Sequence, residues 1–156
     1  MSTKGQALSY DFFISCIIFV LIITIIFSLF RYSNTQISDN QEINQITRTS
    51  QQLSELWMRE GSPRDWDSSN IIDLGLMSNS RFNQTKLNQL EDIGYSEVKN
   101  IAGVGFYEFY LKIYNSDNNT IFDFGLYPLD SEFISKSQRF GILNSTIVFV
   151  DTVVWK

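Results

Sequence analysis

Residues 4–31 read KGQALSYDFFISCIIFVLIITIIFSLFR, and this stretch decides how the rest of the chain is interpreted. The nineteen residues from Phe12 to Phe30 carry no charge and lie between Asp11 and Arg31. At about 1.5 Å per residue, a helix of that length roughly matches the hydrocarbon core of a bilayer. The run therefore predicts one membrane-spanning helix near the N-terminus.

The flanks of this run are not those of a secretory signal. Such a signal has a shorter apolar stretch and a small-residue cleavage site after it. Here the residues that follow are Arg31-Tyr32-Ser33-Asn34, a poor cleavage site, whereas a Gly5-Gln6 junction stands before the run, behind Lys4. Cleavage at that junction would leave the helix on the mature protein.

Lys4, Gly5 and Gln6, followed directly by an apolar helix, resemble the processing site of the type IV prepilin family, most closely its archaeal branch. In that family a prepilin peptidase cuts after the glycine, and the helix becomes the mature N-terminus. The resemblance is strong over residues 4–30 and extends to the rest of the chain only in outline. It implies other pilin subunits, the peptidase and the pilus assembly machinery as partners.

Ser9 and Asp11 resemble the polar and acidic positions that the family carries just beyond the cut. Asp11 is the sixth residue after the junction, whereas many relatives have the acidic residue fifth, where this chain has Tyr10. A carboxylate at membrane depth is costly unless it is paired. Asp11 is therefore expected either to pair with the new amine of Gln6 on a neighbouring subunit or to sit at the lipid interface.

The segment after Arg31 is predicted to continue the helix, because it contains no proline or glycine before Gly61-Ser62-Pro63. It carries one narrow apolar stripe with helical spacing. Packing on the chain's own sheet is favoured over a coiled-coil partner, because the stripe covers barely two heptads. The stripe consists of Ile43, Ile46, Ser50, Leu53 and Trp57.

The C-terminal part alternates apolar and polar residues, as half-buried strands do. Before it, residues 84–101 have helical spacing interrupted at Gly94, and Trp66 is expected to plug the edge of the domain. The fold class is therefore α+β, with a long N-terminal helix packed on a small antiparallel sheet. Strands are expected at residues 107–113, 122–126, 132–140 and 147–155. The last one is expected to be central or well covered, because both its faces are mostly apolar.

These elements divide the chain into four expected segments. The first is the leader, and the second is the transmembrane helix, which would form the filament core. A soluble continuation of the helix and an extracellular head domain follow. Their bounds are 1–5, 6–31, 32–61 and 62–156.

The side chains that carry most enzyme chemistry are missing. The chain has no histidine, and its one cysteine, Cys16, lies inside the apolar run. No Gly-rich phosphate loop opens a helix, so neither catalysis nor a metal or cofactor site is expected. With a net charge of −5 and no basic patch outside the membrane segment, a nucleic-acid-binding face is not expected either.

Three Asn-x-Ser/Thr sequons lie beyond the membrane helix, at Asn83, Asn118 and Asn144. All three fall in expected turns or at segment edges, which suits N-glycosylation of an outside domain. Positive-inside reasoning puts the N-terminus with Lys4 in the cytoplasm and the large domain outside, in the cell membrane or a surface filament.

Two function classes are consistent with this pattern. The first is a structural subunit of a surface filament, a minor pilin or pseudopilin that assembles through its N-terminal helix. The second is a single-pass anchored binding or sensor domain that does not polymerise. Cleavage after Gly5 distinguishes them, because only the filament subunit needs a free helix at its N-terminus.

Overall fold

The computed structural model describes the backbone from Lys4 to Lys156 and the side chains from Tyr10 onward, except that of Ser38. Residues 1–3 of the expected leader lie outside the described residues. The chain forms two compact units that meet between Gln41 and Glu42. The boundary falls inside the expected soluble helix, so the end of that helix belongs to the C-terminal unit.

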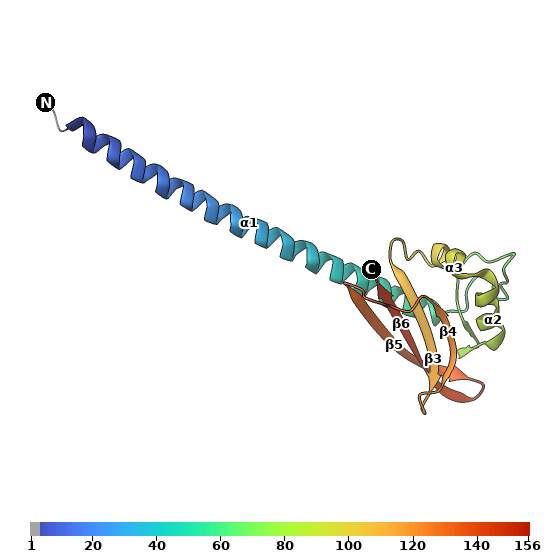
Figure 1. Cartoon of the computed structure of the whole chain (residues 1–156). Helices are drawn as coiled ribbons and strands as arrows, with labels where there is room; N and C mark the ends of the chain where they lie inside the picture. Colours follow the sequence, from blue (N-terminus) through green and yellow to red (C-terminus); the bar gives the residue numbers. More distant parts are fainter. Residues whose placement is uncertain (1–3) are drawn as a thin grey trace. The chain divides into compact units, whose positions relative to one another are not determined.

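Helix α1 (Lys4–Trp57) makes up the described part of the first unit and continues into the second (Figure 1). It contains no proline, and no glycine after Gly5, so nothing in its sequence breaks the backbone hydrogen-bond ladder. The helix is long and apolar enough to cross a membrane, which makes it compatible with the expected anchor.

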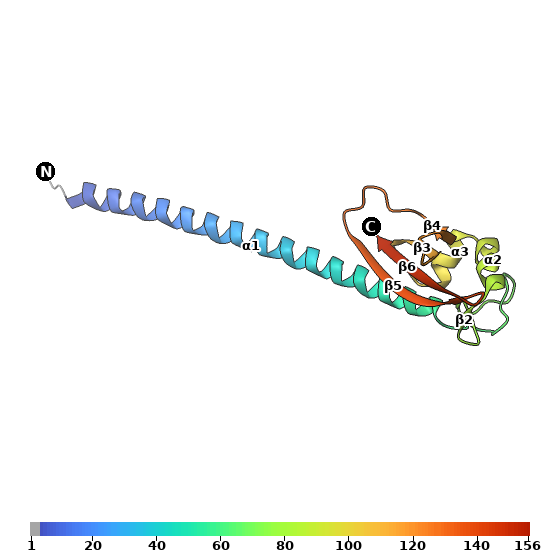
Figure 2. The same cartoon turned by 90° about the horizontal axis from the view of Figure 1, so that it is seen from below.

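The second unit contains a four-stranded antiparallel sheet of β3 (Glu108–Asn115), β4 (Thr120–Gly125), β5 (Ile134–Leu143) and β6 (Thr146–Trp155). The strand order is β4-β3-β6-β5 (Figures 1 and 2). The last strand therefore lies in the middle of the sheet, which agrees with the central or well-covered place that its valine-rich sequence predicted. Together with α1, this sheet confirms the α+β fold.

The end of α1 packs on this sheet, which confirms the expected packing within the chain. Ile46, Ser50, Leu53 and Trp57 are all buried, and the Ser50 hydroxyl donates a hydrogen bond of 3.2 Å to the backbone oxygen of Thr152 on β6. Ser54 on the same face lies 3.0 Å from the hydroxyl of Ser137 on β5. Small side chains thus let the helix approach the sheet closely.

The start of the stripe and the end of the helix differ from the expectation. Ile43 is 48 % exposed, so the covered part begins one turn later, at Ile46. The helix ends at Trp57, before Gly61, because the backbone tightens there. The N–H groups of Met58 and Arg59 donate to carbonyl oxygens only three residues back.

The connector after α1 is folded around Trp66, which is fully buried and donates from Nε1 to the oxygen of Gly75 at 2.9 Å. This confirms the role expected of Trp66 at the domain edge. A short hairpin, β1 (Met77–Ser78) and β2 (Arg81–Phe82), follows. Sequence patterning did not predict it, because two-residue strands show no alternation.

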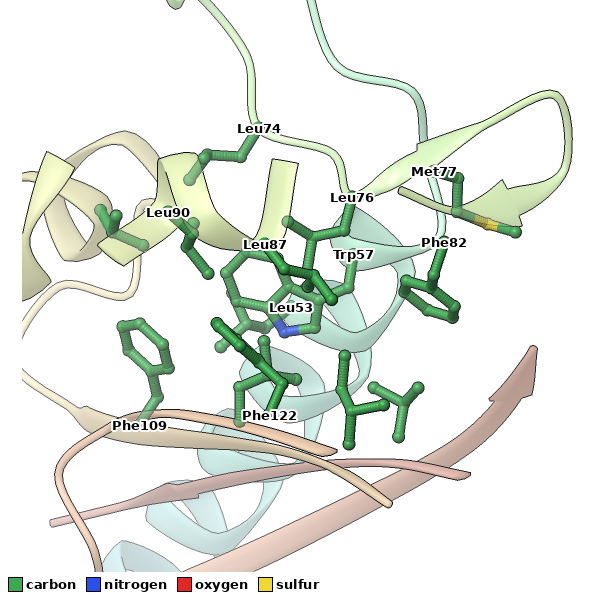
Figure 3. Packing of buried hydrophobic residues seen from close by; sticks show 14 of the residues in the cluster. Leu53, Trp57, Leu74, Leu76, Met77, Phe82, Leu87, Leu90, Phe109 and Phe122 are labelled. Carbon is green, nitrogen blue, oxygen red and sulfur yellow. The ribbon is translucent and has the colours of Figure 1, made fainter. Parts of the chain in front are cut away.

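Two short helices, α2 (Gln84–Ile93) and α3 (Tyr95–Ile101), complete the second unit. They meet at Gly94, whose φ of +84° suits glycine, so the expected break is confirmed. Figure 3 shows Leu87 and Leu90 of α2 packed near Trp57 of α1. One core therefore joins the end of α1, the connector, the short helices and the inner face of the sheet.

Candidate functional site

The apolar part of α1 is a long unpartnered surface. From Phe12 to Phe30 each large apolar side chain is between 48 and 69 % exposed. Soluble monomers rarely expose a continuous apolar surface of this size. An exposed apolar helix of this length is compatible with a membrane anchor.

Two hydroxyl groups in this stretch are satisfied within the helix. The hydroxyl of Thr24 donates to the oxygen of Val20 at 2.8 Å, and that of Ser28 donates to Thr24 at 2.9 Å. Back-bonding of this kind removes the cost of placing a free hydroxyl in hydrocarbon. The guanidinium of Arg31 lies 5.9 Å from the ring centre of Phe27, at the end of the apolar run.

The expected processing residues, Lys4, Gly5 and Gln6, lie in the first turns of α1. Asp11 is exposed, just before the apolar run. Asp11 lies five positions after Gln6, so the α-helix places them about 140° apart around its axis. The helix therefore does not bring the two together within one chain.

The three sequons lie in different local structures. Asn83 caps α2, and its side-chain oxygen accepts a 2.8 Å hydrogen bond from the N–H of Thr85. Asn118 is exposed in the turn between β3 and β4, with φ of +63°. Asn144 is exposed in the two-residue turn between β5 and β6. Asn118 and Asn144 are thus accessible for glycosylation. Asn83 is half-buried, and its amide oxygen is hydrogen-bonded to Thr85.

Glu108 is the centre of a polar cluster in the second unit. Lys99 forms a 2.7 Å ion pair with its carboxylate, and the hydroxyl of Tyr95 donates to it. Burial alone would raise the pKa of Glu108, but the hydrogen bonds from Lys99 and Tyr95 and the charge of Lys99 outweigh burial and lower it. Burial and the bond to Glu108 raise the pKa of Tyr95 well above its usual range.

The Tyr95 oxygen also accepts from the N–H of Phe109, at 3.1 Å. Every polar atom in this cluster therefore holds α3 to β3, which makes the cluster structural.

Lys86 of α2 is buried, which sequence patterning did not indicate. Its ammonium donates to the backbone oxygens of Glu60 and Met77 and lies 5.8 Å from the ring centre of Trp66. Burial lowers the pKa of Lys86, against the attraction of Glu60 and Asp65. The side chain ties α2 to the connector, and only the tertiary packing reveals this role.

Among the side chains that the structure describes, no three His, Cys, Asp or Glu residues gather in a way that could hold a metal ion. Comparisons with protein-family models, curated proteins and solved structures find no match to this chain. The function is therefore inferred from the chain's own residues, above all from the apolar helix and the Gly5-Gln6 junction in front of it.

Proposed function

We propose that this protein is a structural subunit, a minor pilin or pseudopilin, of an archaeal type IV pilus-like surface filament. The observation that carries the proposal is the exposed run Phe12–Phe30, which follows Lys4-Gly5-Gln6 after five intervening residues and is joined to a separate folded unit. A prepilin peptidase would remove residues 1–5, and the pilus assembly machinery would add the processed chain to the filament.

The chemistry of assembly follows from the helix. In the membrane the apolar side chains contact acyl chains, and in a filament they would contact the helices of other subunits. Burying an Ile or Phe side chain contributes about 1.5–3 kcal/mol relative to water, but much less relative to lipid. Extraction from the bilayer therefore needs an energy-coupled machine, and packing between helices holds the product.

Processing would also create a charge at the new N-terminus. Cleavage after Gly5 makes the amine of Gln6 an ammonium, which could pair with Asp11 of a neighbouring subunit. The angular separation of the two residues on one helix favours a partner on a second copy. Pairing would then be possible only after cleavage, which couples assembly to maturation.

We place the N-terminus in the cytoplasm and the second unit outside, from Lys4 before the apolar run and the acidic balance beyond Arg31. On the outside, Asn118 and Asn144 would be the preferred glycosylation sites because their side chains are exposed. Asn83 would be the poorest acceptor because it caps α2.

The experiment compares filament-bound with membrane-bound protein in cells that make the peptidase. Gly5→Leu should block cleavage and keep the protein in the membrane, whereas the control Ser2→Ala changes the leader away from the junction and should leave the sheared filament fraction unchanged. If wild-type protein never enters the sheared fraction, the alternative of an anchored binding or sensor domain is favoured instead.

A further inference from the structure

The second unit has an apolar cavity of about 350 Å³ at the end of the sheet where β5 turns into β6. Its exposed lining includes Phe140, 75 % exposed, and Ile147, 62 % exposed. We call this site the hollow. It is lined by Met58, Met77, Ser80, Phe140, Ile142 and Ile147.

The opposite end of the sheet has an apolar projection. It consists of Leu126, Tyr127 and Leu129, in the loop between β4 and β5, together with Phe106 just before β3. Their exposed fractions are 50, 67, 79 and 96 %, in that order. Figure 2 shows this loop beside the C-terminus, away from the hairpin end of β5 and β6.

The hollow and the projection are too far apart to meet within one unit. Gly125 pairs with Tyr110 near the start of β3, whereas the hollow lies at the far end of β5. The ten residues of β5 span roughly 33 Å at about 3.3 Å each. Each unit therefore presents one concave and one protruding apolar surface on opposite ends.

The charges already paired beside the two surfaces, Glu60 with Arg64 and Lys156 with Glu42, largely cancel. The remaining charged residues next to the two surfaces in the sequence are of opposite sign. Arg59 and Arg81 directly follow Met58 and Ser80 of the hollow, while Asp130 and Glu132 follow Leu129 of the projection. Among the residues that the structure describes, none of these four charged side chains forms an ion pair. The arginines that neighbour the hollow and the carboxylates that neighbour the projection would attract each other between two molecules.

We propose that the projection of one copy docks in the hollow of the next. The two surfaces differ, so the contact is heterologous, and a heterologous contact that does not close into a ring generates an open filament. The inference rests on the proposed filament function and adds to it a second interface, made by the folded units. The partner is a second copy of this chain, because both apolar surfaces and the charges of opposite sign next to them lie on the same molecule.

Disulfide cross-linking of the full-length protein in cells tests this directly. The background carries Cys16→Ser, which removes the native thiol, and Thr146→Val, which removes the sequon beside the hollow but leaves Asn144 in its turn. Leu129→Cys with Ile147→Cys should give a ladder of multimers under mild oxidation. Leu129→Cys alone should give none, because two projections do not meet. The matched control pairs Leu129→Cys with Ile72→Cys, which is 77 % exposed but outside the hollow.

Exchanging the charges next to the two surfaces is a second, independent test. Arg81→Glu or Glu132→Lys alone should weaken the ladder at least several-fold, and the two together should restore it. Both the sheared and the membrane fractions are scored, so the result is separate from filament formation itself. Filaments without a ladder overturn this contact and leave the proposed function standing. A dimer from Leu129→Cys alone, or a ladder of equal strength in the Ile72 control, also overturns it.

Discussion

Glu108 makes the stability of the second unit sensitive to acid. Its pKa is lowered in the folded protein by Lys99 and Tyr95, relative to an ordinary value of 4.5. A carboxyl group with a depressed folded-state pKa stabilises the fold above its unfolded-state pKa. That contribution is lost as the pH falls through the folded-state pKa. The side chain is partly exposed, so the effect is expected to be modest.

The prediction is that Glu108→Gln lowers the Tm at neutral pH and flattens the fall of Tm on acidification. Glutamine keeps hydrogen-bonding capacity but loses the charge that pairs with Lys99. Thermal melting of the purified protein from about pH 7 to about pH 3 measures both effects. Glu91→Gln on the exposed side of α2 is the control, and an equal change there would argue against a special role of Glu108.

Gly141 marks a close approach between β5 and the short hairpin. A Cβ added at this position would lie 2.5 Å from a ring carbon of Phe82, which is buried. Gly141→Ala is therefore expected to destabilise the protein by about 1–3 kcal/mol through overpacking. Chemical denaturation measures the loss, with Ser135→Ala on the same strand face as the control.

Gly141→Ala combined with Phe82→Leu should lose less stability than the two single changes added together. The smaller side chain makes room for the added methyl group. Strict additivity would mean that the two sites do not touch.

At the scale of elements, the hydrophobic periodicity of the sequence was sufficient to predict the longer helices and strands. The stripe on α1, the broken helix at Gly94 and the alternation of β3 all appear in the structure. The β1–β2 hairpin was missed because Asn79 and Ser80, with φ of +51° and +62°, form its turn without any glycine to signal it. Lys86 was missed because nothing in a sequence shows that a lysine finds carbonyl partners inside the fold.

The prediction for helix α1 concerns the replacement of Asp11 by Asn. The change keeps the size of the side chain and the helix length but removes the charge. Membrane insertion should be normal or slightly easier, because a charged residue in the apolar region costs a few kcal/mol on insertion scales. Incorporation into filaments should fall, because the amine of Gln6 on the neighbour loses its partner.

The measurement is the ratio of sheared, filament-bound protein to membrane-bound protein, in wild type and Asp11→Asn, with cleavage confirmed in both. Asp39→Asn, on the polar part of α1, is the matched control and should leave the ratio unchanged. An unchanged ratio in Asp11→Asn would make Asp11 an interface residue and nothing more.

At the scale of the whole molecule, the sequence predicted the fold class, the central or well-covered place of the last strand and the packing of α1 on the sheet. It did not predict the hollow or the projection. These surfaces depend on how residues distant in the chain, such as Met58 and Ile147, come together. In the candidate site, the apolar run could be predicted in full from the sequence. Whether Asn83, Asn118 and Asn144 are accessible could be determined only from the structure.

The second unit contains its own core, so residues 34–156 are expected to fold as a soluble monomer without the apolar run. Among the side chains that the structure describes, the buried ones run from Ile46 to Trp155 and lie in this unit. The first helical turns of the fragment should fray, because an isolated helix is marginal without packing. Circular dichroism should show one cooperative thermal transition. A gradual loss of signal would contradict a self-contained domain.

The proposed function requires that the helix is released at Gly5 for assembly into a filament. Intact-mass analysis of the native protein, recovered from sheared filaments and from membranes, tests this release. A mature chain that begins at Gln6 is expected in the filament fraction. Protein that still begins at Met1, in cells with an active prepilin peptidase and with none of it in filaments, would rule out the proposed function.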